Sequence, residues 1–121
     1  MKLWTNKRRQ NANRYYKLLS DIDGLILPKQ NKNSKHVYHL YVIRTLKRDE
    51  LQEHLYRCGI DTAVHYPIPC HLQPALQTHE HPRSNLAISE KLSKELLSLP
   101  IAEHLSAKNI IYISSSFRCA I

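Results

Sequence analysis

Glycine and phenylalanine are scarce in this sequence of 121 residues, which contains two glycines and one phenylalanine. Apolar residues nevertheless make up 42% of the chain, a share that is ordinary for a globular protein. We therefore expect a core built from leucine, isoleucine, valine and tyrosine. Because a chain of this length can bury more than half of its unfolded surface, we expect one domain over residues 1–121 and not two independent ones.

Several patterns that mark whole classes of protein do not occur. Neither the GxGxxG nor the Walker pattern is present, so the sequence does not indicate an independent nucleotide-binding domain. No apolar run approaches the roughly 20 residues that a membrane-spanning helix needs. The residues after Met1 are basic and polar and do not form the apolar segment of a secretory signal. We therefore expect no membrane partner and a cytoplasmic location.

The cysteines are few and widely spaced. Cys58, Cys70 and Cys119 are odd in number and form no CxxC pair, which argues against a disulfide framework or a zinc knuckle. Cys70 has histidine neighbours but no paired acid or oxyanion-hole motif, so we expect an inert thiol and not a nucleophile.

Positive charge is concentrated at the start of the chain. The formal net charge is +8, and residues 1–35 account for +7 of it, with nine lysines and arginines against Asp21 and Asp23. The basic run at Lys7, Arg8 and Arg9 comes without stacking aromatics or a nucleic-acid motif. This pattern favours a solvated helix face, or a surface for an acidic partner, over a nucleic-acid site. We expect no nucleic-acid partner.

Apolar spacing predicts the secondary structure of the first half. Residues 7–19 are predicted to form a helix with an apolar face made by Ala12, Tyr15, Tyr16 and Leu19. The polar stretch 29–35 indicates a loop, and residues 36–44, apolar on both faces, a strand buried on two sides. A second helix is expected over 47–58, with Gly59 at a position after its end that requires positive φ.

The second half is predicted to contain a strand, a loop and two helices. The strand covers residues 60–66, and the prolines at 67, 69 and 74 predict an irregular loop after it. One helix is expected from a cap at Ser84 to about Leu97, ended by Pro100, and another from a cap at Ser106 to Phe117. The whole pattern predicts an α+β domain in which helices cover a small, mostly antiparallel sheet.

The densest group of chemically active side chains follows the predicted strand. Residues 62–74 contain two histidines, a tyrosine and three prolines, and a loop whose path prolines fix can hold His65, Tyr66 and His71 toward a ligand at little ordering cost. Taken from the residues alone, packing or surface roles for these side chains are equally open.

A metal site is a further possibility, because six histidines could supply imidazole ligands: His36, His39, His65, His71, His79 and His81. The spacing argues against it. His36 and His39 lie on a predicted strand and so point to opposite sides, and the His79 to His81 pair falls in a polar loop. We expect no metal site.

The order of these segments resembles the C-terminal domain of the DegT/DnrJ/StrS family of pyridoxal-phosphate-dependent sugar aminotransferases. Four stretches carry the resemblance: Arg8 to Tyr15, His39 to Arg44, Arg48 through Gly59 to Ala75, and Leu97 to Ile101. The most specific is His65-Tyr66-Pro67-Ile-Pro-Cys-His71, at its distance after Gly59-Ile60. By this resemblance, residues 7–20 are the helix that links to a large cofactor domain, and 36–113 are the body of the small domain of an aspartate-aminotransferase-type enzyme.

The resemblance also implies a function. Such enzymes transfer an amino group from an amino acid to a keto group of a nucleotide-linked deoxysugar, and they work as homodimers. His65, Tyr66, Pro67 and His71 would belong to the loop on the sugar side of pyridoxal phosphate. The family's cofactor lysine lies in the large domain, which has no counterpart in this sequence.

We therefore expect a C-terminal fragment that is inactive by itself, contains no catalytic residue and binds no cofactor alone. The alternative is a non-catalytic binding module that pairs with a separate large-domain chain or with a partner of its basic patch.

Overall fold

The computed structural model describes residues 1–77 and 86–119. Its elements follow in the order α1 (Lys2–Leu19), β1 (Tyr41–Arg44), α2 (Arg48–Arg57), the short 3-10 helix η1 (Cys70–Leu72), α3 (Pro74–Gln77), α4 (Ala87–Glu95), β2 (Leu96–Leu99) and α5 (Ala107–Phe117). β1 and β2 form an antiparallel sheet in which Tyr41 lies opposite Leu99 and Arg44 opposite Leu96. The expected α+β class with a small antiparallel sheet is confirmed.

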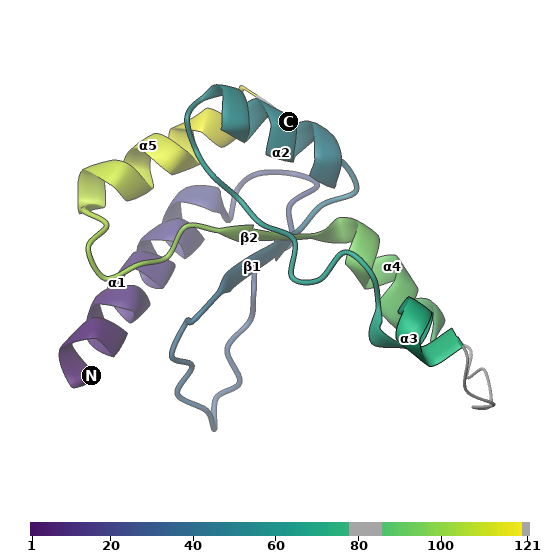
Figure 1. Ribbon diagram of the computed structural model, residues 1–121. Helices are drawn as coiled ribbons and strands as arrows, with labels where there is room; N and C mark the ends of the chain where they lie inside the picture. The colour runs from purple at the N-terminus through teal and green to yellow at the C-terminus, as the bar shows by residue number, and fades with distance from the viewer. Residues whose placement is uncertain (78–85, 120–121) are drawn as a thin grey trace.

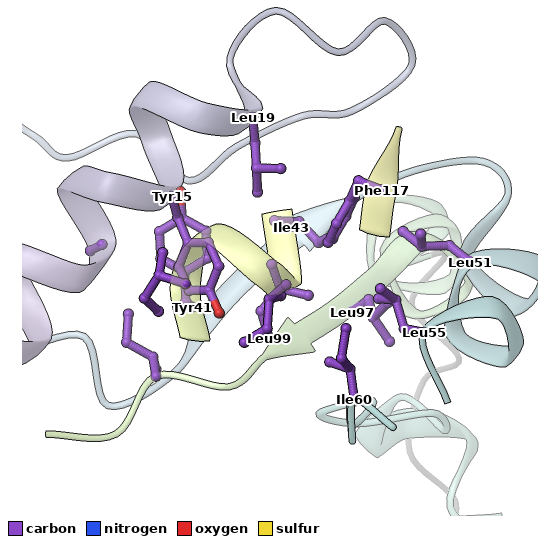
Figure 2. Packing of buried hydrophobic residues seen from close by; sticks show 14 of the residues in the cluster. Tyr15, Leu19, Tyr41, Ile43, Leu51, Leu55, Ile60, Leu97, Leu99 and Phe117 are labelled. Atoms are coloured by element: carbon purple, nitrogen blue, oxygen red, sulfur yellow. The ribbon is translucent and has the colours of Figure 1, made fainter. Parts of the chain in front are cut away.

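One face of this sheet packs against helices. Figure 1 shows α1 and α5 side by side, with α2 close to α5, while α3 and α4 lie beyond the end of the sheet. The core is drawn from α1, β1, α2, β2 and α5, and Figure 2 shows its main members: Tyr15, Leu19, Tyr41, Ile43, Leu51, Leu55, Leu97, Leu99 and Phe117. Because strand side chains alternate between faces, the other face of β2 carries Ser98.

The core composition differs from the expectation in two residue types. The single phenylalanine, Phe117, is fully buried, so it is a central core residue. Valine is not among the fully buried core residues of the described chain, and Val64 packs only at the margin of the cluster. The expected apolar face of α1 is also narrower than predicted, since Tyr16 is 54% exposed.

Isolated bridges extend the sheet on both sides. Ile26 pairs with Arg44 beyond β1, and Ala63 pairs with Ser98 beyond β2, both antiparallel. Around Ala63 the side chains alternate, because Val64 packs against the core while Ala63 and His65 line the opposite side. The predicted strand over 60–66 is therefore wrong in extent: one bridge forms there and no regular strand.

The first strand is also shorter than predicted. Residues 36–40 are not part of β1, because the Tyr38 backbone N–H donates to Nδ1 of His36 and Tyr38 adopts a φ of 50°. This local bond takes the donor that a ladder would need. β1 is buried on one side only: Tyr41 and Ile43 are buried, whereas Val42 and Arg44 are half-buried.

Two of the predicted helices agree with the structure, and a third ends earlier than predicted. α2 and its following Gly59, with φ at 72°, are as expected. α5 is capped by Ser106 and Asn109, whose side chains each bind the other's backbone N–H, as the sequence predicted at Ser106. The helix expected up to Leu97 ends at Glu95 instead, because the chain enters β2 before Pro100. The predicted cap at Ser84 lies outside the described residues.

Polar contacts fasten α1 to the segment that follows β2. The buried Asn11 amide donates to the carbonyls of Ala102 and Leu105, at 3.2 Å each, and the Tyr15 hydroxyl donates to the Pro100 carbonyl at 2.8 Å. These bonds satisfy carbonyl groups that no strand or helix takes up. They also fix the path of residues 100–105 beside α1.

Candidate functional site

A groove of about 430 Å³ lies on the side of β2 that faces away from the core. Its walls come from Arg8 of α1, residues 39–40 before β1, residues 61–65 beside β2, and residues 98–102 at the end of β2. Segments that are distant in sequence thus meet at this groove, because β2 lies between the segment before β1 and residues 61–65. The groove joins the predicted site loop, through His65, to Ser98 and Leu99 of the sheet.

His65 is the predicted site residue that lines this groove. Its Nδ1 lies 2.9 Å from Oγ of Ser98, and Ser98 is 5% exposed. The Ala63 to Ser98 bridge fixes the backbone two residues earlier, with both ladder bonds formed at 2.8 and 3.2 Å. His65 is therefore a half-buried imidazole of defined orientation at the surface of the sheet.

Tyr66 and Pro67 are exposed. The peptide bond between His65 and Tyr66 is cis, and the two rings meet edge to face with centroids 5.6 Å apart. Tyr66 remains 74% exposed, so its phenol projects into solvent beside the groove. An exposed aromatic ring supported on one edge offers a stacking surface for a planar or sugar ring.

His71 is held by a different part of the fold. It lies in η1, and its Nε2 is 3.1 Å from Oε1 of Glu90 in α4. This contact links the loop to α4, which lies beside α3 and leads directly into β2 (Figure 1). Of the four predicted substrate residues, His65, Tyr66 and Pro67 are adjacent at the groove, and His71 belongs to a neighbouring site on α4.

The groove carries two buried polar atoms that have no hydrogen-bond partner within residues 1–77 and 86–119. They are Nε of Arg8, from α1, and Oγ1 of Thr62, from the segment beside β2. Another nitrogen of Arg8, Nη2, donates to the Glu103 carboxylate at 2.9 Å. The pKa of Glu103 lies below its ordinary value because its own backbone N–H binds the carboxylate and because Arg8 is beside it. At the groove, Arg8 is therefore in an ion pair with Glu103, beside two buried polar atoms that the described residues leave unpaired.

Lysine does not occur among the residues that line the groove. Pyridoxal phosphate is held in enzymes through a lysine amine, and the groove supplies no amine for that bond. The groove residues therefore cannot bind pyridoxal phosphate covalently by themselves, because they include no lysine.

Sequence reasoning missed three side chains of this region. Arg8 was assigned to a solvated basic run, although it forms a wall of the groove. Ser98 had a signal, because a small polar residue between Leu97 and Leu99 marks the face of a strand that is not packed into the core. Nothing in the spacing pointed to Glu90.

The histidines named as possible metal ligands lie in separate parts of the chain. In the described part of the chain, no group of three or more histidines, cysteines or carboxylates could hold a metal ion. His36 and His39 precede β1, so the reason given from the sequence, opposite sides of one strand, is wrong. His79 and His81 lie outside the described residues. Cys58, Cys70 and Cys119 are all free thiols.

Comparison with known proteins decides the family. The model of the DegT/DnrJ/EryC1/StrS aminotransferase family matches residues 1–118. The chain belongs to this family. The fold agrees: a crystal structure of the Streptomyces venezuelae family member DesV, in complex with a ketimine intermediate, superposes with a TM-score of 0.89 at 36% identity. The match covers 95% of this chain and 31% of that one. The resemblance carried by the block from His65 to His71 is thereby confirmed.

Two curated relatives match over a similar extent. The dTDP-3-amino-3,4,6-trideoxy-alpha-D-glucose transaminase of Streptomyces venezuelae is 36% identical over 95% of this chain and 30% of its own length. A pleiotropic regulatory protein of Geobacillus stearothermophilus is 41% identical over 91% of this chain and 30% of its own length. The chain thus spans about 30% of the length of these curated relatives. Among residues 1–77 and 86–119, none of the helices has the length and apolar character needed to cross a membrane.

Proposed function

We propose that this chain is the C-terminal domain of a pyridoxal-phosphate-dependent aminotransferase that acts on a keto-deoxysugar nucleotide. The observation that carries the proposal is the fit of 95% of the chain, at a TM-score of 0.89, to 31% of a sugar aminotransferase structure. When bound, the cofactor carries an amino group from an amino acid to the keto carbon. We assign its lysine to the remaining part of the enzyme, and so expect the 121-residue chain to be inactive alone.

The role proposed for this chain is substrate binding. His65 lines the groove, Tyr66 and Pro67 lie exposed beside it, and His71 lies further along the loop, in η1, where it contacts Glu90 of α4. Arg8, which also lines the groove and is paired with Glu103, can donate to a substrate that carries phosphate oxygens. These side chains would orient a nucleotide sugar toward a cofactor held by the other domain.

A chimeric enzyme tests this proposal. In the Streptomyces venezuelae transaminase, the matching 30% is replaced by this chain, and transamination of the dTDP-amino sugar named for that enzyme is measured. We expect visible cofactor absorbance and activity in the chimera, and neither in the chain alone. A chimera that folds and binds cofactor but has no transaminase activity contradicts the proposal.

The contribution of His65 is tested in the same chimera. His65→Ala should lower kcat/KM about 10-fold, the effect of losing about 1.4 kcal/mol of polar contact to the substrate. His104→Ala is the matched control, because His104 is an exposed histidine outside the groove lining. Equal kcat/KM values in the two variants would rule out a substrate role for His65.

A second candidate function, a non-catalytic binding module, has one observation in its favour. The N-terminal end of α1 projects from the body (Figure 1), and it exposes Leu3 and Trp4 by 65% and 54%. Large apolar side chains at a basic helix end suit a second polypeptide, either a separate large-domain chain or an acidic partner. Sedimentation of the purified chain tests this. A stable monomer that does not bind an added large-domain chain would exclude a module that pairs with such a chain.

The proposal also covers the cellular location and the oligomeric state of the enzyme. We place it in the cytoplasm as a homodimer, with no membrane or nucleic-acid partner, on the basis of the sequence pattern and of the sugar-nucleotide relatives. Sizing chromatography of the chimera at several concentrations tests the dimer, and a strictly monomeric active enzyme would contradict it.

A further inference from the structure

Ser98 lies where a polar side chain is unusual, in the middle of a buried strand between two core leucines. It is 5% exposed, and its backbone N–H and carbonyl are both bonded to Ala63. The hydroxyl lies 2.9 Å from Nδ1 of His65. Within residues 1–77 and 86–119, this ring nitrogen is the partner that the structure gives to the Ser98 hydroxyl.

The direction of this hydrogen bond determines the tautomer of His65. A hydroxyl is both donor and acceptor, whereas a neutral imidazole has one nitrogen of each kind. If Nδ1 carried the proton and donated to Ser98, the buried hydroxyl hydrogen would have no acceptor, which costs free energy. If the hydroxyl donates to Nδ1, both groups are satisfied. His65 then carries its proton on Nε2.

We infer that Nε2 faces the groove, because Nδ1 is engaged with Ser98 and the ring lines the groove. The two nitrogens lie on different edges of the ring, and the edge with Nδ1 is turned toward β2. His65 also lines the groove, and the neighbouring Tyr66 ring supports it from the side. The imidazole is thus held by a hydrogen bond at one edge and by an aromatic contact.

We propose that Ser98 is a positioning residue that fixes His65 in the Nε2–H tautomer and so presents a hydrogen-bond donor to the groove. The ligand group that it selects is an uncharged or anionic oxygen acceptor, from the sugar or from the phosphates of the nucleotide sugar. The identity of the ligand depends on the function proposed above, whereas the tautomer does not. Ser98 acts through His65 and need not touch the substrate.

Nitrogen-15 NMR of the imidazoles in the purified 121-residue chain tests the positioning role directly. The wild-type spectrum should show His65 with protonated Nε2 and unprotonated Nδ1. Ser98→Ala should lower the Nε2–H to Nδ1–H ratio about fivefold, which corresponds to one hydrogen bond of about 1 kcal/mol. Ser98→Thr, which keeps the hydroxyl, should restore the ratio.

The control for this experiment is Ser93→Ala. Ser93 is also buried, but its hydroxyl donates to the Glu90 carbonyl, away from His65. This variant should leave the His65 signals unchanged, and the backbone spectrum of each variant reports whether it folds. A wild-type His65 protonated on Nδ1, or a tautomer ratio that Ser98→Ala leaves unchanged, would overturn the proposal.

Kinetics of the chimera separate this inference from the function on which it depends. Ser98→Ala should raise KM for the nucleotide sugar about fivefold with little change in kcat. The reason is that the variant loses the correct placement of the His65 Nε2–H, which binds the substrate and takes no part in the reaction. Weaker inhibition by dTDP alone would assign the acceptor to phosphate, and an unchanged dTDP inhibition would assign it to the sugar. If the NMR result holds but His65→Ala leaves kcat/KM unchanged, the positioning stands and the substrate role proposed for His65 fails.

Discussion

Two buried tyrosines in contact offer a paired test of the hydrogen bonding in the core. The rings of Tyr15 and Tyr41 pack with centroids 5.0 Å apart, and the residues are 0% and 1% exposed. The Tyr15 hydroxyl donates to the Pro100 carbonyl at 2.8 Å. The Tyr41 hydroxyl is buried and has no hydrogen-bond partner in the part of the chain that the structure describes.

The two hydroxyl deletions should therefore have opposite consequences. Tyr15→Phe removes a hydrogen bond and leaves the Pro100 carbonyl unpaired, so we expect the free energy of unfolding to fall by about 1 to 2 kcal/mol. Tyr41→Phe removes a desolvated hydroxyl that no bond compensates, so we expect the free energy of unfolding to stay constant or rise by about 1 kcal/mol. Ring packing is preserved in both variants, which makes each the control for the other.

Urea unfolding followed by far-UV circular dichroism measures this difference. At unchanged m-value, the midpoints of the two variants should lie on opposite sides of the wild-type midpoint, or the Tyr41→Phe midpoint should coincide with it. Equal destabilisation of both variants would refute the reasoning. It would mean that the Tyr41 hydroxyl has a partner in solution.

Three further predictions concern pH and stability. Burial raises the pKa of both tyrosines above the ordinary value of 10.0, so the unfolded chain releases their protons first. The free energy of unfolding should therefore be constant below pH 10 and fall above it, by about 1.4 kcal/mol per pH unit for each tyrosine. Urea titrations at each pH measure this slope, and Tyr15→Phe should reduce it. Asn11→Ala removes the amide that binds the Ala102 and Leu105 carbonyls, so thermal unfolding should show a loss of about 2 kcal/mol, and a neutral result would contradict the anchoring role of Asn11. Ser106→Ala breaks the cap of α5 and should cost about 1 kcal/mol, whereas Ser115→Ala, on the exposed side of the same helix, should cost less.

The parts of the fold that sequence predicts well are those controlled by local chemistry. Ser106 begins α5 because a hydroxyl three residues before Asn109 can bind its backbone N–H, and Gly59 follows α2 because positive φ suits glycine. The strands were predicted less well. Residues 36–40 leave the sheet through the bond from the Tyr38 N–H to His36, and β propensity contains no information on that competition.

The loop residues of the candidate site could be predicted from the sequence, whereas the residues around them, Ser98 and Arg8, could not. The proline-rich segment singled out His65, Tyr66 and His71 as candidates for a ligand site, and the family resemblance added Pro67. Ser98 and Arg8 are 33 and 57 residues from His65 in sequence, and only the pairing of β2 with Ala63 and the packing of α1 bring them to it. Long-range contacts of this kind leave no periodic signal in a single sequence.

The alternation beside β2 has a consequence for how this enzyme family can vary. Val64 packs against the core and His65 lines the groove, so the hydrophobic cluster sets the register of the imidazole. One residue inserted or deleted between Ile60 and Val64 would turn the imidazole inward and an aliphatic side chain outward. Changes in loop length are therefore tolerable only after His65, where the chain has left the sheet. The length of the loop can therefore vary on the C-terminal side of His65 and is constrained on the N-terminal side.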